Sequence, residues 1–154
     1  MRTFAWKVSV GVLATAACKV KHHISESEVC RLCGDSKDDS FHALITCPSS
    51  VAIWNTMRQV WPLPTNDELI YTGPEWLMSL LADRPEKIRA MIIMLLWRIW
   101  SVRNDQLHHK ATPPLDITKD FLCSYLCSFN QAQKYIIEDI IKGKMTVDEQ
   151  VAIP

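Results

Sequence analysis

The sequence predicts a mostly α-helical fold, and three observations support this prediction. Apolar residues recur at intervals of three and four along several stretches, which is the period of a helix buried on one face. Prolines stand where such stretches begin or end, whereas no stretch alternates apolar and polar residues as a half-buried strand would. The chain has 154 residues, 48% of them hydrophobic, so it is long enough to bury a core of its own.

The N-terminal part predicts two helices separated by a polar loop. A first helix is expected over residues 3–20, where the apolar side chains fall on one face. Residues 24–47 are polar and rich in turn-forming residues, and they hold three of the six cysteines. Pro48 is placed for the first turn of a second helix, which Pro62 and Pro64 end.

The C-terminal part predicts three further helices. Pro74 favours the first turn of a short helix, and Asp83 is expected to cap a long helix that runs to about His108. The two prolines that follow Thr112 break the chain, and a last helix is expected to begin at about Asp116.

Four residues in the polar loop have the spacing of a structural metal site. Cys30 and Cys33 stand three positions apart on an expected tight turn, and His42 and Cys47 follow. Two such pairs can complete a tetrahedron around Zn²⁺, and four protein ligands leave no position for a reacting water. Gly34 permits the positive φ that the turn after Cys33 needs. The sequence therefore predicts a structural zinc ion held by Cys30, Cys33, His42 and Cys47.

Other histidines and cysteines have less support as ligands. His22 and His23 could compete for the metal, but they precede an acidic stretch and are expected to be exposed. Cys18 has no partner in a metal-binding pattern. Cys123 and Cys127 are four positions apart on one helical face, where small apolar side chains pack. These three cysteines are therefore expected in the core.

The expected architecture is a small helical domain with an inserted zinc-knuckle-like CCHC loop. Residues 1–64 would form a zinc-binding domain of helix, loop and helix. Residues 65–144 would form a helical extension that packs on this domain, and residues 145–154 a flexible tail.

Short motifs in the first half of the chain resemble a known family. Phe4-Ala-Trp-Lys-Val is followed by Leu13-Ala-Thr, by Cys-x-x-Cys-Gly, by Phe-His-Ala-Leu, by Cys-Pro and by Ile53-Trp54. This order resembles the zinc-binding domain of reverse transcriptases from plant non-LTR (LINE-type) retrotransposons. The segment from Leu96 to Asn104 resembles the helix that follows this domain in those polyproteins.

The resemblance covers most of residues 2–110 and has three implications. It makes Cys30, Cys33, His42 and Cys47 the zinc ligands, and it implies work beside a template RNA. Because polymerase and RNase H regions flank this domain in the family, the chain is identified as a short stand-alone derivative without either of them.

The acidic residues do not predict an enzyme. Polymerase and RNase H chemistry both need several carboxylates that converge on two metal ions, and the carboxylates of this sequence are scattered along it. Asp38 and Asp39 are expected to keep a turn soluble, and Glu138 and Asp139 to do the same for a helix face.

Two functional hypotheses follow. In the first, the chain is a non-catalytic, retrotransposon-derived protein that binds and interferes with a host protein, or that self-associates through its last helix. In the second, it is a zinc-stabilised module that binds RNA or DNA. Residues 1–33 hold five Lys and Arg against two acidic residues, a net charge of +3, whereas the whole chain is neutral. Neutrality gives the first hypothesis a slight preference. The candidate nucleic-acid-binding residues are Arg2, Lys7, Lys19, Lys21, His22 and Arg31.

The sequence favours an intracellular protein. The longest apolar run, from Met91 to Trp97, is too short to span a membrane. No secretory leader is recognisable, so a reducing setting is expected, in the nucleus or the cytoplasm. Residues 1–25 contain four basic residues and no acidic one, which makes a mitochondrial transit signal the alternative.

Overall fold

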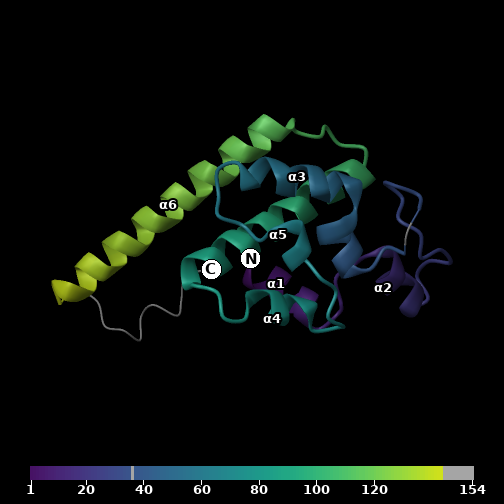
Figure 1. Ribbon diagram of the computed structural model, residues 1–154, viewed down its shortest axis with the longest axis horizontal. Coiled ribbons are helices and arrows are strands. Elements are labelled where there is room, and N and C mark those ends of the chain that lie inside the picture. Colours follow the sequence, from purple (N-terminus) through teal and green to yellow (C-terminus); the bar gives the residue numbers. More distant parts are fainter. Residues whose placement is uncertain (36, 144–154) are drawn as a thin grey trace. The chain divides into compact units, whose positions relative to one another are not determined.

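The computed structural model describes residues 1–35 and 37–143, and this part of the chain is helical (Figure 1). The strand-like pairing in these ranges is limited to an isolated antiparallel bridge between Val29 and Lys37. The predicted mostly α-helical fold is therefore confirmed. The α-helices are α1 (Arg2–Ser9), α2 (Ala16–Lys21), α3 (Pro48–Arg58), α4 (Trp76–Leu81), α5 (Glu86–Leu107) and α6 (Leu115–Ile141). A π-helical turn, η1 (His42–Thr46), and a 3₁₀ turn, η2 (Asn66–Glu68), complete the described elements.

The chain divides into two compact units, residues 1–119 and residues 120–154. The described part of the second unit is the continuation of α6. The domain boundary after residue 64 and the helical extension over residues 65–144 stay predictions, and the expected tail over residues 145–154 lies outside the described residues. None of the described helices is both long and apolar enough to cross a membrane.

The core of the first unit surrounds α5, which contacts α1, α3 and η1. Figure 1 shows α5 running between α3 and α1. The side chains buried here are large and apolar, and they include Leu44, Trp54, Met57, Ile92, Leu95, Leu96 and Ile99. Burial of such side chains is the main source of stability in a domain of this size, and it fixes α3 and η1 beside α5.

The predicted single helix over residues 3–20 is wrong, because two helices occupy this segment. The α1 helix ends at Ser9, and Gly11 takes a left-handed conformation with φ +72°. The N–H of Gly11 donates to the carbonyl of Val8, and the N–H of Val12 to that of Lys7. These two bonds form a Schellman motif, which ends a helix regardless of the apolar pattern beyond it. Thr15 then caps α2 by accepting from the N–H of Cys18.

Asp83 does not cap the long helix as predicted. It lies just after α4 with φ +57°, and α5 begins at Glu86 with Pro85 as its N-cap residue. A residue that precedes proline is sterically disfavoured in helical conformation, so the helix cannot extend back through Arg84. The predicted end near His108 is confirmed, since α5 ends at Leu107.

The expectation that three cysteines lie in the core is also wrong. Cys127 is exposed, and Cys18 and Cys123 are half-buried. Cys18 lies on α2, which has only six residues and buries none of them.

Candidate metal centre

The four predicted ligands lie together although they come from three separate local structures. Cys30 and Cys33 belong to a turn that begins directly after Val29, and the N–H of Gly34 closes it by donating to the Cys30 carbonyl over 2.8 Å. His42 begins η1 and Cys47 is the N-cap residue of α3. Their ligand atoms all lie within 4.8 Å of one another.

The distances between these atoms fit a tetrahedral zinc ion. Zn–S bonds of about 2.3 Å and Zn–N bonds of about 2.0–2.1 Å place two sulfurs about 3.8 Å apart, and a sulfur and a nitrogen about 3.6 Å apart. The sulfur atoms of Cys30 and Cys47 are 3.9 Å apart, and Cys33 Sγ lies 3.5 Å from His42 Nε2. Three of the four residues are buried and Cys33 is half-buried. The donor set thus has both the chemistry and the spacing of a structural zinc site.

The imidazole of His42 is oriented by its neighbours. Its Nδ1 lies 3.1 Å from the hydroxyl oxygen of Thr46, one turn further along η1. A hydrogen bond at Nδ1 fixes the tautomer that leaves Nε2 free to bind a metal, which is a common arrangement in zinc sites. The carboxylate of Asp39 accepts from the His42 N–H over 2.8 Å, at the residue where η1 begins.

Two carbonyl groups of the π-helical turn η1 accept hydrogen bonds from side chains of α3. The N–H of Cys47 donates to the carbonyl of His42, which closes the π-helical turn. Ser50 Oγ donates to the carbonyl of Ala43 over 2.7 Å, and Trp54 Nε1 donates to that of Leu44 over 2.9 Å. Both side chains are buried, so the π-helical turn that carries His42 is held against α3 from inside the core.

A buried ion pair lies directly behind the sulfur atoms. The Arg103 guanidinium, on α5, contacts the Asp38 carboxylate at 2.5 Å, Cys30 Sγ at 3.5 Å and Cys47 Sγ at 3.8 Å. Asp38 is held in turn by the N–H of Ala16, at the start of α2, which donates to Oδ2 over 2.9 Å. The expectation that Asp38 serves the solubility of a turn is therefore wrong, because only 3% of the residue is exposed.

The pKa values of the two buried thiols beside Arg103 are shifted in opposite directions. Burial would raise the pKa of Cys30, but hydrogen bonds from the N–H of Cys33 and from the Arg103 guanidinium outweigh it and lower this pKa to about 6. Burial raises the pKa of Cys47 to about 11, assisted by the nearby Cys30 sulfur. One of the two sulfurs is thus a thiolate near neutral pH, and the other must lose a proton to bind a metal.

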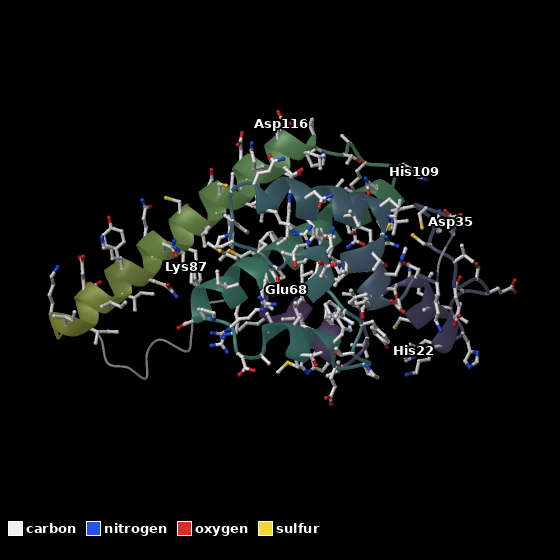
Figure 2. The ribbon with its side chains drawn as sticks, in the orientation of Figure 1. His22, Asp35, Glu68, Lys87, His109 and Asp116 are labelled. Atoms are coloured by element: carbon white, nitrogen blue, oxygen red, sulfur yellow. The ribbon has the colours of Figure 1, made fainter. Side chains whose placement is uncertain are left out.

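The structure does not gather the predicted nucleic-acid-binding residues into one surface. All six are exposed. Arg2 and Lys7 lie on α1. His22 follows the end of α2 and is labelled in Figure 2. Lys19 and Arg31 line a common hollow of about 170 Å³ beside Asp38.

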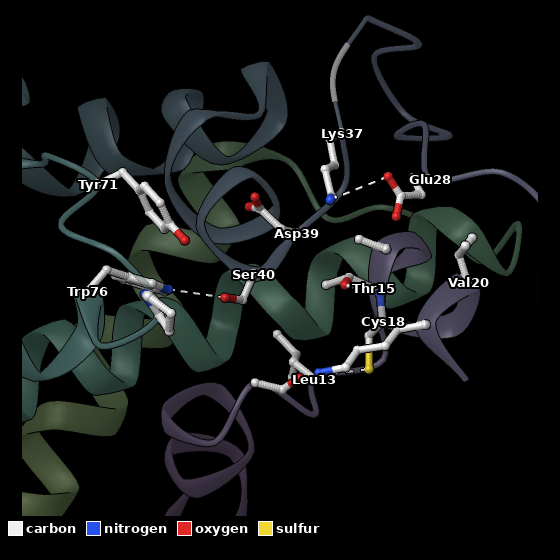
Figure 3. Close-up of a pocket in the computed structure, with 14 residues that line it drawn as sticks. Leu13, Thr15, Cys18, Val20, Glu28, Lys37, Asp39, Ser40, Tyr71 and Trp76 are labelled. Carbon is white, nitrogen blue, oxygen red and sulfur yellow. Dashed lines mark hydrogen bonds and ion pairs between the residues drawn. The ribbon is translucent and has the colours of Figure 1, made fainter. Parts of the chain in front are cut away.

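Lys21 lines a different and larger hollow, of about 520 Å³ (Figure 3). Trp76, on one wall, donates to Ser40 Oγ over 3.1 Å, and Lys37 pairs with Glu28 over 3.4 Å. Because two lysines and two carboxylates line this hollow, it has no single charge that would select an anion or a cation.

Comparison with known proteins bears on the same segment. Residues 1–54 match a family model described as zinc-binding in reverse transcriptase. The resemblance to the reverse-transcriptase zinc-binding domain is thereby confirmed for this segment. The match contains the whole Cys/His quartet and ends at Trp54.

A plant protein also matches the chain. It is the "Putative ribonuclease H protein" of Arabidopsis thaliana, 27% identical over 123 residues. The match covers 77% of this chain but 20% of the relative, so the chain spans about a fifth of that protein's length. No solved structure matches the chain. The plant relative is consistent with a retrotransposon-derived sequence, and the stand-alone character of the chain stays a prediction.

The spacing of the sequence indicated the four ligands but not the groups around them. Arg103 lies 73 positions from Cys30 and 56 from Cys47, so no local pattern connects them. The one available signal was Arg103 itself, a charged residue that follows the apolar positions of α5 at helical spacing.

Proposed function

We propose that the chain is a non-catalytic, retrotransposon-derived protein that uses a structural zinc site to present a docking surface for another protein. Four protein ligands leave no open coordination position, so the metal would contribute folding energy rather than chemistry. Within residues 1–35 and 37–143, the Cys/His quartet is the only group of three or more potential metal-ligating side chains. Carboxylates that could hold two catalytic metal ions do not converge in those ranges, which supports a function without catalysis.

The observation that carries this proposal is an exposed apolar patch on α1 and α4. Trp6, on α1, and Val10, the C-cap residue that follows this helix, are four positions apart and are 59% and 49% exposed. Met78, on α4, is 58% exposed, and its Sδ lies 4.0 Å from Ser9 Oγ on α1. Trp6, Val10 and Met78 are here called the α1–α4 patch. Tryptophan is among the residues that most often dominate a protein interface, and large exposed apolar groups on adjacent helices favour docking.

Charge beside the patch indicates the partner's chemistry. Arg2 is four positions before Trp6 and shares its helical face, and Lys7 follows Trp6 directly; both are exposed. No acidic residue lies on α1. We therefore propose a partner that offers an apolar anchor flanked by acidic side chains.

The test is affinity purification of the full zinc-loaded chain at moderate salt, with and without nuclease. We expect a protein that wild type retains and that Trp6→Ser and Met78→Ser lose, with weaker retention for Arg2→Gln. Ile70→Ser is the control, since Ile70 is 65% exposed and lies outside the patch. Equal retention by wild type and both patch variants would refute the docking surface, and loss of all retained protein on nuclease treatment would favour nucleic acid.

A second candidate function, binding of RNA or DNA, is favoured by the hollow that Lys19 and Arg31 share with Asn104 and His108. Here the carboxylate of Asp38 is already occupied by Arg103 and the N–H of Ala16, which leaves the cationic groups available to phosphate. Affinity for single-stranded RNA that falls steeply with salt, and that drops for Lys19→Gln and Arg31→Gln, would support this function. The intracellular localisation and its mitochondrial alternative stay predictions.

A further inference from the structure

Arg103 lies outside the segment that the zinc-binding family model covers, yet it contacts the metal site. The match to the family model ends at residue 54, whereas Arg103 lies near the end of α5. Only 2% of the residue is exposed. A buried guanidinium is costly unless charged or polar groups compensate it. The compensation seen here comes from one carboxylate and two prospective metal ligands.

Both terminal nitrogens of the Arg103 guanidinium take part in these contacts. The Nη2 atom reaches Cys30 Sγ and Asp38 Oδ1, and Nη1 reaches Cys47 Sγ. In the described part of the chain, Nε has no hydrogen-bond partner, so the two terminal nitrogens carry the compensation. Lysine could not reproduce this fork, because an ammonium is a single point of charge on a flexible stem.

The charges around the site also call for a cation at this position. Three thiolates, one neutral imidazole and Zn²⁺ carry one net negative charge. Arg103 places a positive charge against two of the three thiolates. Asp38 holds the guanidinium from the other side and is itself fixed by the N–H of Ala16. Asp38 therefore links α5 to the start of α2 behind the metal ligands, through its ion pair with Arg103 and its hydrogen bond from Ala16.

We propose that Arg103 is an outer-sphere positioning residue of the metal centre, which hydrogen-bonds the sulfur atoms of Cys30 and Cys47 and holds them at the separation that a tetrahedral metal requires. The metal-binding unit then includes α5 and is larger than the family-matched segment 1–54. This inference rests on the metal site of the proposed function and is independent of the α1–α4 patch.

The test compares three variants of the full chain: Arg103→Met, Arg103→Lys and Arg89→Met. Methionine keeps the unbranched apolar stem of arginine and removes the charge and the donors. Arg89 is exposed on the same helix and serves as the matched control. Zinc affinity is measured by competition with a chromophoric chelator. The thiolate-to-metal charge-transfer band is recorded with Co²⁺ in place of zinc, and circular dichroism reports the helical content.

Arg103→Met should bind zinc about 10–100-fold more weakly than wild type, which is the usual effect of losing an outer-shell partner. Arg103→Lys should lie between the two, and Arg89→Met should match wild type. In the Co²⁺ form of Arg103→Met, the charge-transfer band should move to lower energy, because sulfur lone pairs that lose hydrogen bonds are held less tightly. A residue that only fills the core would not shift this band.

Two results would overturn the inference while leaving the metal site intact: zinc affinity of Arg103→Met within about twofold of wild type, or an unshifted charge-transfer band in a variant that retains its helices. If Arg103→Met does not fold, Arg103→Lys decides, and wild-type affinity with a wild-type band in that variant would refute the role. A wild-type chain that binds neither zinc nor Co²⁺ would instead refute the metal site itself.

Discussion

Replacing Trp54 by phenylalanine tests how η1 is held on α3. The indole N–H donates to the Leu44 carbonyl over 2.9 Å, and Trp54 is only 1% exposed. Phenylalanine keeps an aromatic ring beneath the Arg58 guanidinium, which lies 5.5 Å from the Trp54 ring centre. The substitution therefore removes one hydrogen-bond donor and one ring and leaves most of the packing in place.

The expected cost is the sum of two effects. A buried carbonyl left without its donor costs about 1–3 kcal/mol. Loss of the second ring removes buried apolar surface worth about 1 kcal/mol at roughly 25 cal/mol per Å², and a partly unfilled cavity adds to this. We therefore expect Trp54→Phe to lower the free energy of unfolding by about 2–4 kcal/mol.

Urea denaturation of the zinc-loaded chain, followed by circular dichroism, measures this difference. Trp6→Phe is the matched control, because Trp6 is 59% exposed and the same substitution there should change stability by no more than about 0.5 kcal/mol. The slope of unfolding free energy with urea should stay the same in both variants. A loss below about 1 kcal/mol for Trp54→Phe would refute the assigned role of its N–H.

Three further predictions concern the metal loop. Apparent zinc affinity should fall about tenfold or more per pH unit as the pH drops from 8 to 6, because Cys47, with its pKa raised to about 11, must release a proton on binding. Below about pH 6, which is the pKa of Cys30, a second thiol must also release a proton, so the affinity should fall more steeply with pH. Isothermal titration with a competing chelator measures both slopes, and a pH-independent affinity would contradict them. Gly34→Ala should lower the urea-derived stability of the zinc-loaded chain by about 1–2 kcal/mol, since φ is +77° there while nothing lies within 4 Å of an added Cβ. A Gly34→Asn variant, which tolerates this conformation better, should lose less, and equal losses would argue against a backbone cause. Thr46→Val should weaken zinc binding by about tenfold in the chelator competition, because it removes the partner of His42 Nδ1, and unchanged affinity would mean that water replaces the hydroxyl.

Local signals in the sequence predicted most of the helices. Pro48 begins α3 as expected, and the predicted long helix ends within one residue of the observed end of α5 at Leu107. Apolar periodicity did not reveal the break after α1, because the break depends on backbone hydrogen bonds around Gly11 and not on the pattern of side chains. The π-helical turn over His42–Thr46 was not predicted either, since its carbonyls are satisfied by Ser50 and Trp54 from the next helix.

The candidate metal site was predictable to the extent that it is local. Cysteines and a histidine at fixed short spacings indicated the quartet that the structure brings together. The groups that hold this quartet depend on the tertiary fold. Nothing in the sequence distinguishes Asp38 from an exposed acidic residue in a turn. Arg103 reaches the sulfur atoms only because α5 passes behind them in the folded chain. Outer-sphere groups of this kind require a structure to be found.

Native mass spectrometry of the purified full chain tests most directly whether Cys30, Cys33, His42 and Cys47 bind one structural zinc ion. Wild type should carry about one zinc ion per chain, Cys33→Ser should carry almost none, and Cys18→Ser, which changes a cysteine outside the quartet, should match wild type. Equal zinc content in wild type and Cys33→Ser would contradict the account.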